Sequence, residues 1–202
     1  MMNSDNIDVL VVYPICPEMR LPAARLYQKE FAKGLRLFIG TGEPAVKILS
    51  EALNLDMAVG AVVQARLVGI VGLQHDGRRF IELRWGIYRK EFGLVQSALR
   101  YAACVIFSIP RHWNFSSGSW ALNGTAVDRE FRCRGIGRLL ISAVVDLAAR
   151  SGTSSVYTTV YCRNRRALSM FKGAGFRPTG VISRIILTVG APMALVLKVQ
   201  LV

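Results

Sequence analysis

The chain has 202 residues, of which 52% are hydrophobic. That composition can bury the core of a globular domain, so we expect residues 1–202 to form a single domain. Lys and Arg number 26 against 13 Asp and Glu, and the net charge of +13 favours an anionic partner: a phosphorylated cofactor, an acidic substrate, nucleic acid or a membrane surface. No zinc-finger, RNP or helix-turn-helix pattern accompanies the charge, so we expect no specific nucleic-acid binding.

The cysteine positions and the lengths of the apolar runs bear on where in the cell the protein is expected. Cys16, Cys104, Cys133 and Cys162 are far apart and include no CxxC pair, which fits neither a zinc site nor a disulfide framework. The first residues are acidic, whereas a secretory signal begins with basic residues. Ile185–Leu197 is shorter than the ~20 apolar residues of a transmembrane helix. We therefore expect a cytoplasmic protein with reduced thiols and no metal, with peripheral attachment to a membrane as an alternative.

The first part of the chain predicts a strand, two helices and a strand hairpin. Ile7–Tyr13 is β-branched and aromatic and is followed by prolines, which is typical of a strand. Apolar residues recur at helical spacing over Ala23–Phe38, and again over Pro44–Leu55. Met57–Gln64 and Leu67–Gln74 are apolar runs separated by two residues, which predicts an antiparallel pair of strands.

A long helical stretch follows a predicted turn at His75–Arg78. Apolar residues repeat at helical spacing over Phe80–Pro110, with arginines and lysines between them. Gly86 and Gly93 weaken this helix, so one bent helix and two shorter helices both remain open. A loop rich in Ser, Gly and aromatic residues is expected over Pro110–Ser119.

The second half alternates strands and helices. The pattern predicts a strand over Trp120–Val127, a helix over Gly137–Ser151, a strand over Ser155–Tyr161, a helix over Arg165–Gly173 capped by Asn164, and closing strands over about Val181–Val189 and Met193–Leu201. Strands that alternate with crossover helices predict an α/β domain with a mixed sheet.

The loop before the second-half helix carries the clearest chemical signal. It reads Arg132-Cys133-Arg134-Gly135-Ile136-Gly137-Arg138. The glycines remove side chains where a ligand approaches the backbone, and the beginning of the helix offers unpaired N–H groups at the positive end of its dipole. A pyrophosphate placed there would accept several backbone hydrogen bonds, and the arginines would add charge-assisted ones. The pattern lacks the GxGxxG of dinucleotide-binding folds and the Gly-Lys-Ser/Thr of NTPase phosphate loops.

Two linked motifs resemble a known family. The stretch Ala126–Leu140, which contains this loop, resembles the acetyl-CoA-binding motif of the GNAT superfamily of N-acyltransferases. Further along the chain, six residues resemble the second GNAT signature: Val160, Asn164, Ala167, Phe171, Gly175 and Phe176. The motifs lie in the order and at the spacing of that superfamily. The resemblance implies an α+β fold with a mixed, mostly antiparallel central sheet, a splayed strand pair and flanking helices.

The resemblance also implies acetyl-CoA, or another acyl-CoA, as co-substrate. The loop backbone would hold its pyrophosphate, and the last residues of the strand Trp120–Val127 would bind the pantetheine arm between the splayed strands. Asn164 would contact the cofactor as well as cap its helix. The implied cofactor-binding residues are Thr125, Ala126, Val127, Arg132, Cys133, Arg134, Gly135, Ile136, Gly137, Arg138, Asn164 and Phe171.

The chain departs from the family pattern at the general acid. Phe171 stands where the superfamily usually has a tyrosine that protonates the departing thiolate. Because a thiol has a pKa of about 8.5, its thiolate already leaves readily, and loss of the acid need not abolish transfer. Tyr161 and Ser169 are the candidate replacements nearby in sequence.

The general base is not evident either. The strand Trp120–Val127 carries no acidic residue, and Asp128, just beyond it, is expected to cap the loop. His75 and Glu82 are candidates from elsewhere, although a turn histidine and a solvated glutamate are the favoured explanations for them. The sequence therefore identifies no catalytic residue.

Residues 80–113 form an insert, since this gap is usually short in the superfamily. Between Arg78 and Arg111 seven basic residues stand against two acidic ones, with aromatic residues interleaved. One interpretation is docking on an anionic membrane surface or binding of a lipid-like substrate. The other is an additional helix packed on the sheet, with a solvated basic face or a homodimer contact.

The function that these observations favour is acyl transfer from acyl-CoA to an amine acceptor by direct attack on the thioester. The acceptor class is open: a small amine, a polyamine, an aminoglycoside, a protein amine or a lipid precursor. The alternative is a non-catalytic module that binds CoA or another anion on the same fold, which the missing tyrosine and the missing strand acid favour.

Overall fold

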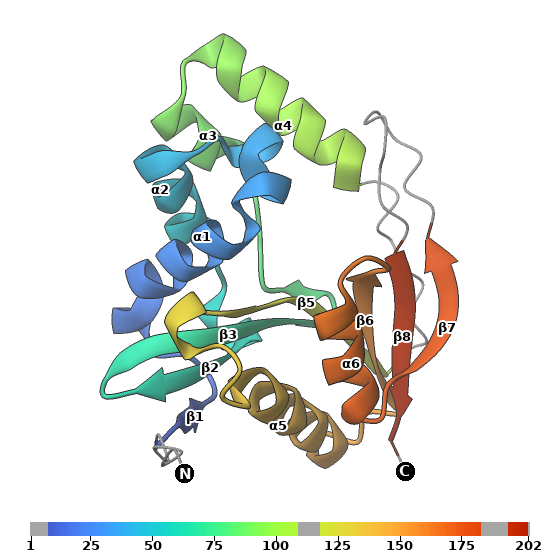
Figure 1. The fold of residues 1–202 in the computed structure, drawn as a ribbon. Coiled ribbons are helices and arrows are strands. Elements are labelled where there is room, and N and C mark those ends of the chain that lie inside the picture. Colours follow the sequence, from blue (N-terminus) through green and yellow to red (C-terminus); the bar gives the residue numbers. More distant parts are fainter. Residues whose placement is uncertain (1–7, 109–117, 183–193, 202) are drawn as a thin grey trace.

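The computed structural model describes residues 8–108, 118–182 and 194–201. Within them, eight strands form one sheet in the order β1-β2-β3-β5-β6-β8-β7, with β4 paired to β3 (Figure 1). The strands are β1 (Leu10–Val12), β2 (Ala58–Val63), β3 (Arg66–His75), β4 (Arg78–Arg79), β5 (Ser119–Val127), β6 (Ser155–Tyr161), β7 (Arg177–Ile182) and β8 (Ala194–Gln200). Only β5 and β6 pair in parallel among them, so the expected mixed, mostly antiparallel sheet is confirmed.

Helices cover both faces of this sheet. They are α1 (Arg20–Ile39), α2 (Gly42–Ala52), α3 (Trp85–Glu91), α4 (Leu94–Ser108), α5 (Ile136–Arg150) and α6 (Arg165–Gly173). Figure 1 shows α1 to α4 on one face, where α1 crosses β3 and β5, and α5 on the other face, beneath the same strands. No helix in the described ranges combines the length and apolar composition needed to cross a bilayer.

The β2–β3 hairpin forms the most deeply buried part of the sheet. All of β2 and residues 67–73 of β3 are buried, because helices cover both faces of these strands. The turn residues Gln64 and Ala65 have positive φ values of 48° and 62°, the geometry whose twist suits a two-residue hairpin. The predicted antiparallel pair is therefore confirmed.

The predicted helical stretch Phe80–Pro110 is two helices, and its first residues are extended. Phe80 accepts a 2.8 Å hydrogen bond from the amide of Asn54, and Ile81 bridges Leu53. Gly93 separates α3 from α4. Local periodicity could not show that Phe80 is a core residue whose ring fills the space beneath Gly72.

The strand boundaries differ from the prediction at the two ends of the sheet. β1 is limited to Leu10–Val12, and β7 begins at Arg177 rather than near Val181. β7 includes Pro178, which is tolerated because β7 is an edge strand. The predicted loop after Pro110 and most of the predicted strand Val181–Val189 lie outside the described residues.

Gly72 gives a test of this packing. A Cβ on Gly72 would lie 2.2 Å from Cδ1 of Phe80 and 2.8 Å from the backbone oxygen of Asn123. We expect Gly72→Ala to lower the free energy of unfolding by ~2–3 kcal/mol, because the ring is buried and the strand cannot give way. Urea denaturation followed by circular dichroism measures the change.

Gly34, in the middle of α1, is the matched control. A Cβ there meets no atom within 4 Å, so Gly34→Ala should stabilise the protein by ~0.5–1 kcal/mol through helix propensity. Equal stability of the two variants would contradict the packing described for Gly72.

Candidate functional site

β5 and β6 separate shortly after they begin. They pair at Ser119 with Ser155, Trp120 with Val156 and Ala121 with Tyr157, and no further pair joins them. β6 remains paired to β8 along its whole length, and β5 to β3 as far as Val127. The facing edges of β5 and β6 beyond Ala121 are therefore unpaired with each other, which is the expected splayed strand pair. Such an edge can hydrogen-bond an extended amide-containing ligand.

A bulge lies at the point where the two strands separate. The register between β3 and β5 shifts between Val71 and Leu73, and Gly124 has a φ of +82°. Tyr27 of α1 lies against this bulge and donates a 3.3 Å hydrogen bond from its hydroxyl to the carbonyl of Asn123. A Cβ at Gly124 would lie 2.6 Å from that hydroxyl. A glycine inside a strand pattern was the signal that could have predicted the bulge.

The unpaired edge of β5 leads to the N-terminus of α5. Gly135 is the N-cap residue, with φ 80° and ψ −8°, and no side chain caps the helix. The first helical hydrogen bond runs from the amide of Leu139 to the carbonyl of Gly135, so the amides of Ile136, Gly137 and Arg138 have no acceptor within the helix. Cys133 is also left-handed, with φ 62°, and such alternation can form a concave group of N–H donors. This helix end can receive an anion.

The two glycines of the loop have different roles. A Cβ at Gly135 would meet nothing within 4 Å, so this residue is open to solvent and needs glycine mainly for its positive φ. A Cβ at Gly137 would lie 2.7 Å from Sδ of Met170 on α6. Gly137 therefore allows α5 and α6 to approach each other, a role that the sequence pattern did not indicate.

The three loop arginines also differ. Arg132 donates from Nε to the carbonyl of Val127 at 3.0 Å and pairs through Nη2 with Glu30 of α1. Arg134 is exposed and lies over the ring of Phe131, 5.7 Å from its centroid, and Arg138 is exposed on the first turn of α5. Arg134 and Arg138 are thus better placed than Arg132 to reach a bound phosphate.

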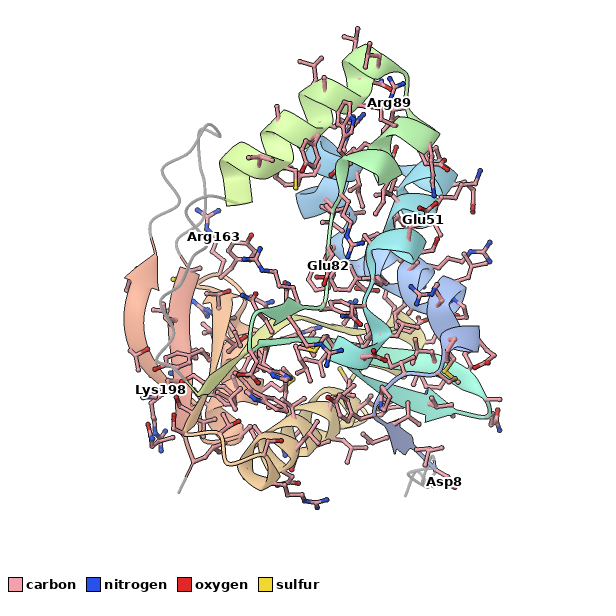
Figure 2. All side chains as sticks on the ribbon, turned by 180° about the vertical axis from the view of Figure 1, so that it is seen from behind. Asp8, Glu51, Glu82, Arg89, Arg163 and Lys198 are labelled. Carbon is pink, nitrogen blue, oxygen red and sulfur yellow. The ribbon has the colours of Figure 1, made fainter. Side chains whose placement is uncertain are left out.

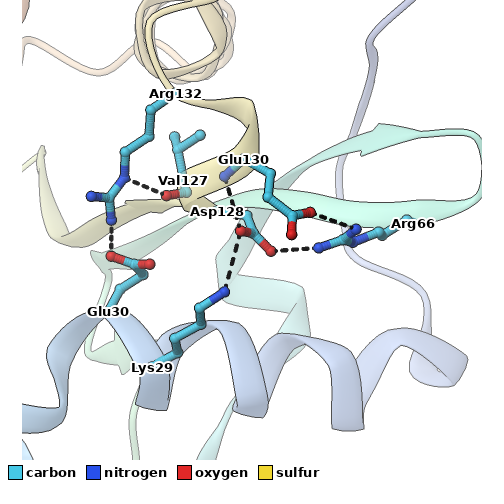
Figure 3. A network of polar contacts seen from close by, with 7 residues as sticks. All are labelled: Lys29, Glu30, Arg66, Val127, Asp128, Glu130 and Arg132. Atoms are coloured by element: carbon cyan, nitrogen blue, oxygen red, sulfur yellow. Dashed lines mark hydrogen bonds and ion pairs between the residues drawn. The ribbon is translucent and has the colours of Figure 1, made fainter.

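Asp128 joins the loop to α1 and to the β2–β3 hairpin (Figure 3). Its side chain is buried and accepts hydrogen bonds from Lys29 at 3.3 Å, from Arg66 at 2.7 Å and from the amide of Glu130 at 3.3 Å. Arg66 also pairs with Glu130 at 3.0 Å. The expected loop cap at Asp128 is confirmed, but its two cationic partners could not be anticipated from local sequence.

The surroundings of the Asp128 carboxyl shift its pKa. Burial alone would raise the pKa of this carboxyl, but the hydrogen bonds from Arg66, the Glu130 amide and Lys29 outweigh burial and lower the pKa below its ordinary value. The ionised form therefore stabilises the folded protein at neutral pH. That contribution is present above the pKa of an unfolded aspartate and is lost as the pH falls through the lower folded pKa.

Two residues of the second predicted motif, Asn164 and Phe171, have structural roles in α6. The side chain of Asn164 accepts a 3.1 Å hydrogen bond from the amide of Ala167, which confirms the predicted helix cap. Phe171 is only 4% exposed and packs edge-on against Phe176, with ring centroids 5.2 Å apart. Tyr161, at the end of β6, and Ser169, on α6, are exposed. Cofactor contacts at Asn164 and Phe171 remain predictions.

The candidate bases lie in two places: His75 beside the last paired residues of β5 and β6, and Glu82 in a separate pocket. His75 stacks on Trp120, with ring centroids 4.1 Å apart, where β5 and β6 are still paired. Trp120 is one residue before the end of that pairing, and it is seven residues, or ~23 Å along an extended strand, before Val127 at the other end of β5. Glu82 accepts a 2.5 Å hydrogen bond from Arg84 and lines a separate pocket of about 420 Å³ that also contains Arg20. The ion pair with Arg84 does not support Glu82 as a general base, and that role for His75 stays a prediction.

The lowered pKa of Asp128 generates a prediction. We expect Asp128→Asn to lower the free energy of unfolding by ~1–2 kcal/mol at pH 7, because charge-assisted hydrogen bonds to Lys29 and Arg66 are lost. Since the wild-type carboxylate is protonated only at acidic pH, the difference between the two proteins should shrink as the pH falls from 6 to 3. Urea denaturation across that pH range measures it. Asp146→Asn, at an exposed position on α5, is the control, and an equal loss in that variant would contradict the role of Asp128.

Comparisons with known proteins agree with this geometry. The sequence model described as the Acetyltransferase (GNAT) family matches residues 55–176, more than half of the chain. No curated protein sequence matches the chain significantly.

Solved acetyltransferases share the fold. The ribosomal-protein-S18-alanine N-acetyltransferase from Escherichia coli is 14% identical, with a TM-score of 0.58 over 96% of this chain and 94% of that one. A GNAT-family acetyltransferase from Streptococcus pneumoniae is 16% identical, with a TM-score of 0.60 over 96% and 99%. The Salmonella typhimurium protein yncA, solved with its cofactor acetyl-CoA, is 12% identical, with a TM-score of 0.60 over 96% and 94%.

These similarities bear out the predicted fold and the predicted co-substrate at the level of the family, which uses acetyl-CoA. The structural matches have low sequence identity and establish the fold alone. The family match covers both the splayed strands and the loop before α5. This chain therefore belongs to the GNAT family of acetyltransferases.

Proposed function

We propose that this protein is an N-acyltransferase that transfers an acetyl group from acetyl-CoA to an amine acceptor. The observation that carries the proposal is the continuous path from the unpaired edge of β5 to the uncapped N-terminus of α5. The strand edge suits the amides of a pantetheine arm, and the helix end with Arg134 and Arg138 suits a pyrophosphate.

The chain's own groups suggest how transfer would proceed. The acceptor nitrogen attacks the thioester carbonyl, the C–N bond forms, the C–S bond breaks, and the nitrogen loses a proton as CoA leaves. A backbone N–H on the unpaired edge of β5 would stabilise the oxyanion. The bulge held by Tyr27 lies at the beginning of that edge, so its conformation would affect where the thioester carbonyl points.

Cofactor binding can be tested at the two exposed arginines. We expect acetyl-CoA to raise the melting temperature of the wild-type protein by mass action. Arg134→Ala with Arg138→Ala should raise the Kd for acetyl-CoA by roughly 10- to 100-fold for each charge-assisted hydrogen bond lost. Differential scanning fluorimetry and calorimetry measure the two effects.

Arg150, at the opposite end of α5, provides the control. Arg150→Ala should leave the Kd unchanged, because its side chain is exposed far from the helix N-terminus. Gly135→Val should remove binding, since a β-branched residue is strained at φ 80°. The proposal is overturned if the wild-type protein shows no shift with acetyl-CoA or a longer acyl-CoA.

A second candidate function is a CoA-binding module without turnover. Phe171 supports it, because this buried ring has no proton to donate to a departing thiolate. Release of free CoA thiol with a panel of amines separates the candidates: small amines, polyamines, aminoglycosides, N-terminal peptides and lipid amines. Binding without thiol release from any acceptor would favour the module.

Turnover without a tyrosine acid has a measurable consequence. An alkyl thiol is a far stronger acid than an alcohol (a cysteine thiol has a pKa of about 8.5), so the CoA thiolate can leave without protonation. We expect Tyr161→Phe to change kcat by less than about threefold at pH 8, because an acid that is not required contributes little. A fall of more than about 100-fold, with a changed pH profile, would instead assign the general acid to Tyr161. The Kd for acetyl-CoA should be unchanged in either case.

A further inference from the structure

α4 is oriented with its apolar side outward. Leu94, Val95 and Leu99 are 62%, 72% and 68% exposed. At 100° per residue, the exposed residues occupy one continuous side of the helix. We call this side the outer face of α4; its apolar members are Leu94, Val95, Ala98, Leu99, Ala102 and Val105. Within the part of α4 whose side chains are described, Gln96 is the one exposed polar residue.

The polar residues of α4 face the protein instead. Ser97 is fully buried and donates to the carbonyls of Tyr88 and Phe92, each at 3.0 Å. Arg100 donates to the carbonyls of Arg36 and Leu37 at 3.1 and 3.3 Å, where α1 ends. A cation at a helix C-terminus is favourable, so these contacts fix the rotation of α4. Arg100 therefore does not belong to a solvated basic face, whereas Arg84, Arg89 and Lys90, earlier in the predicted insert, are exposed.

The outer face is located at the edge of the molecule. Figure 1 shows α4 outside α1 and α3, away from the sheet. Trp85 of α3 is partly exposed and packs edge-on against Tyr101 of α4, with centroids 5.6 Å apart. An exposed, continuous apolar helix face next to a tryptophan is unusual on a soluble surface and indicates a docking site.

We propose that the outer face of α4 docks into the surface of an anionic lipid membrane. An interfacial helix buries its apolar face at the boundary of headgroups and acyl chains, and basic residues nearby add attraction to anionic headgroups. α4 carries no acidic residue, and the chain has a net charge of +13. Figure 2 shows Arg89 beside the beginning of α4, and Lys33 and Arg36 are exposed on α1, to which α4 is anchored.

A second copy of the chain fits this face less well. Two molecules that each carry +13 repel one another, whereas an anionic surface attracts both. One side of a 15-residue helix is also smaller than the roughly 800 Å² that each partner buries in a stable interface. The loop before α5 contacts α1, but α5 itself lies on the other face of the sheet from α4, so docking through the outer face of α4 does not cover the N-terminus of α5.

Vesicle sedimentation tests the proposal. The full chain is mixed with vesicles of phosphatidylcholine alone and with vesicles containing about a third phosphatidylglycerol. We expect binding to the anionic vesicles, weak binding to the neutral ones, and release at high salt. The variant Val95→Glu with Leu99→Glu should bind anionic vesicles at least tenfold more weakly, because two apolar groups become charged.

The matched control is Leu10→Glu with Val181→Glu, two similarly exposed apolar residues on β1 and β7. It makes the same change in charge and should retain vesicle binding. Acetyl-CoA affinity and melting temperature report that both variants remain folded. An equal loss of vesicle binding in the two variants would show that net charge, and not the outer face of α4, determines binding. That result would overturn the proposal. Absence of vesicle binding, together with a concentration-dependent dimer that only Val95→Glu/Leu99→Glu abolishes, would assign the face to a second copy instead.

Discussion

The carboxylate of Asp128 is the charge that holds together β3, α1 and the loop before α5. The Asp128 side chain is only 9% exposed, and a carboxylate buried to that extent is unfavourable unless it is paired and hydrogen-bonded. Its partners come from three segments that are distant in sequence: Lys29 on α1, Arg66 at the beginning of β3, and the amide of Glu130 in the loop. Satisfying this one group brings a helix, a hairpin and a loop to the same place. Arg132 then adds a second link between the loop and α1 through Glu30.

The position of the loop determines how the N-terminus of α5 is presented. β5 ends where its neighbour β6 has already separated from it, and the chain passes through the loop into a helix without a side-chain cap. The amides of such a helix end must be satisfied by water or by a ligand, and an anion with several oxygens suits them. Our proposed acetyl-CoA site rests on this geometry, in which an unpaired strand edge continues into a group of N–H donors.

The sequence predicted the elements well because periodicity is a local property. α6 and β6 have the predicted limits, and α5 differs by one residue at each end. Local sequence could not predict which side chains the tertiary fold brings together as partners. Lys29 and Glu30 look like solvated charges of an amphipathic helix until α1 crosses β5. Arg100 looked like part of a basic outer surface, but the free carbonyls at the end of α1 are a better partner for it than water.

Phe171 is a core residue at the position where the family usually has an acidic tyrosine. Its ring packs against Phe176 where α6 leads into β7, so this position contributes to the core. A hydroxyl buried at the same site would need a hydrogen-bond partner, or the folded protein would lose stability. A thiolate leaves without protonation far more readily than an alkoxide would, because a thiol is the stronger acid. The rate would then depend mainly on placing the amine against the thioester, through the backbone of β5 and the bulge that Tyr27 holds.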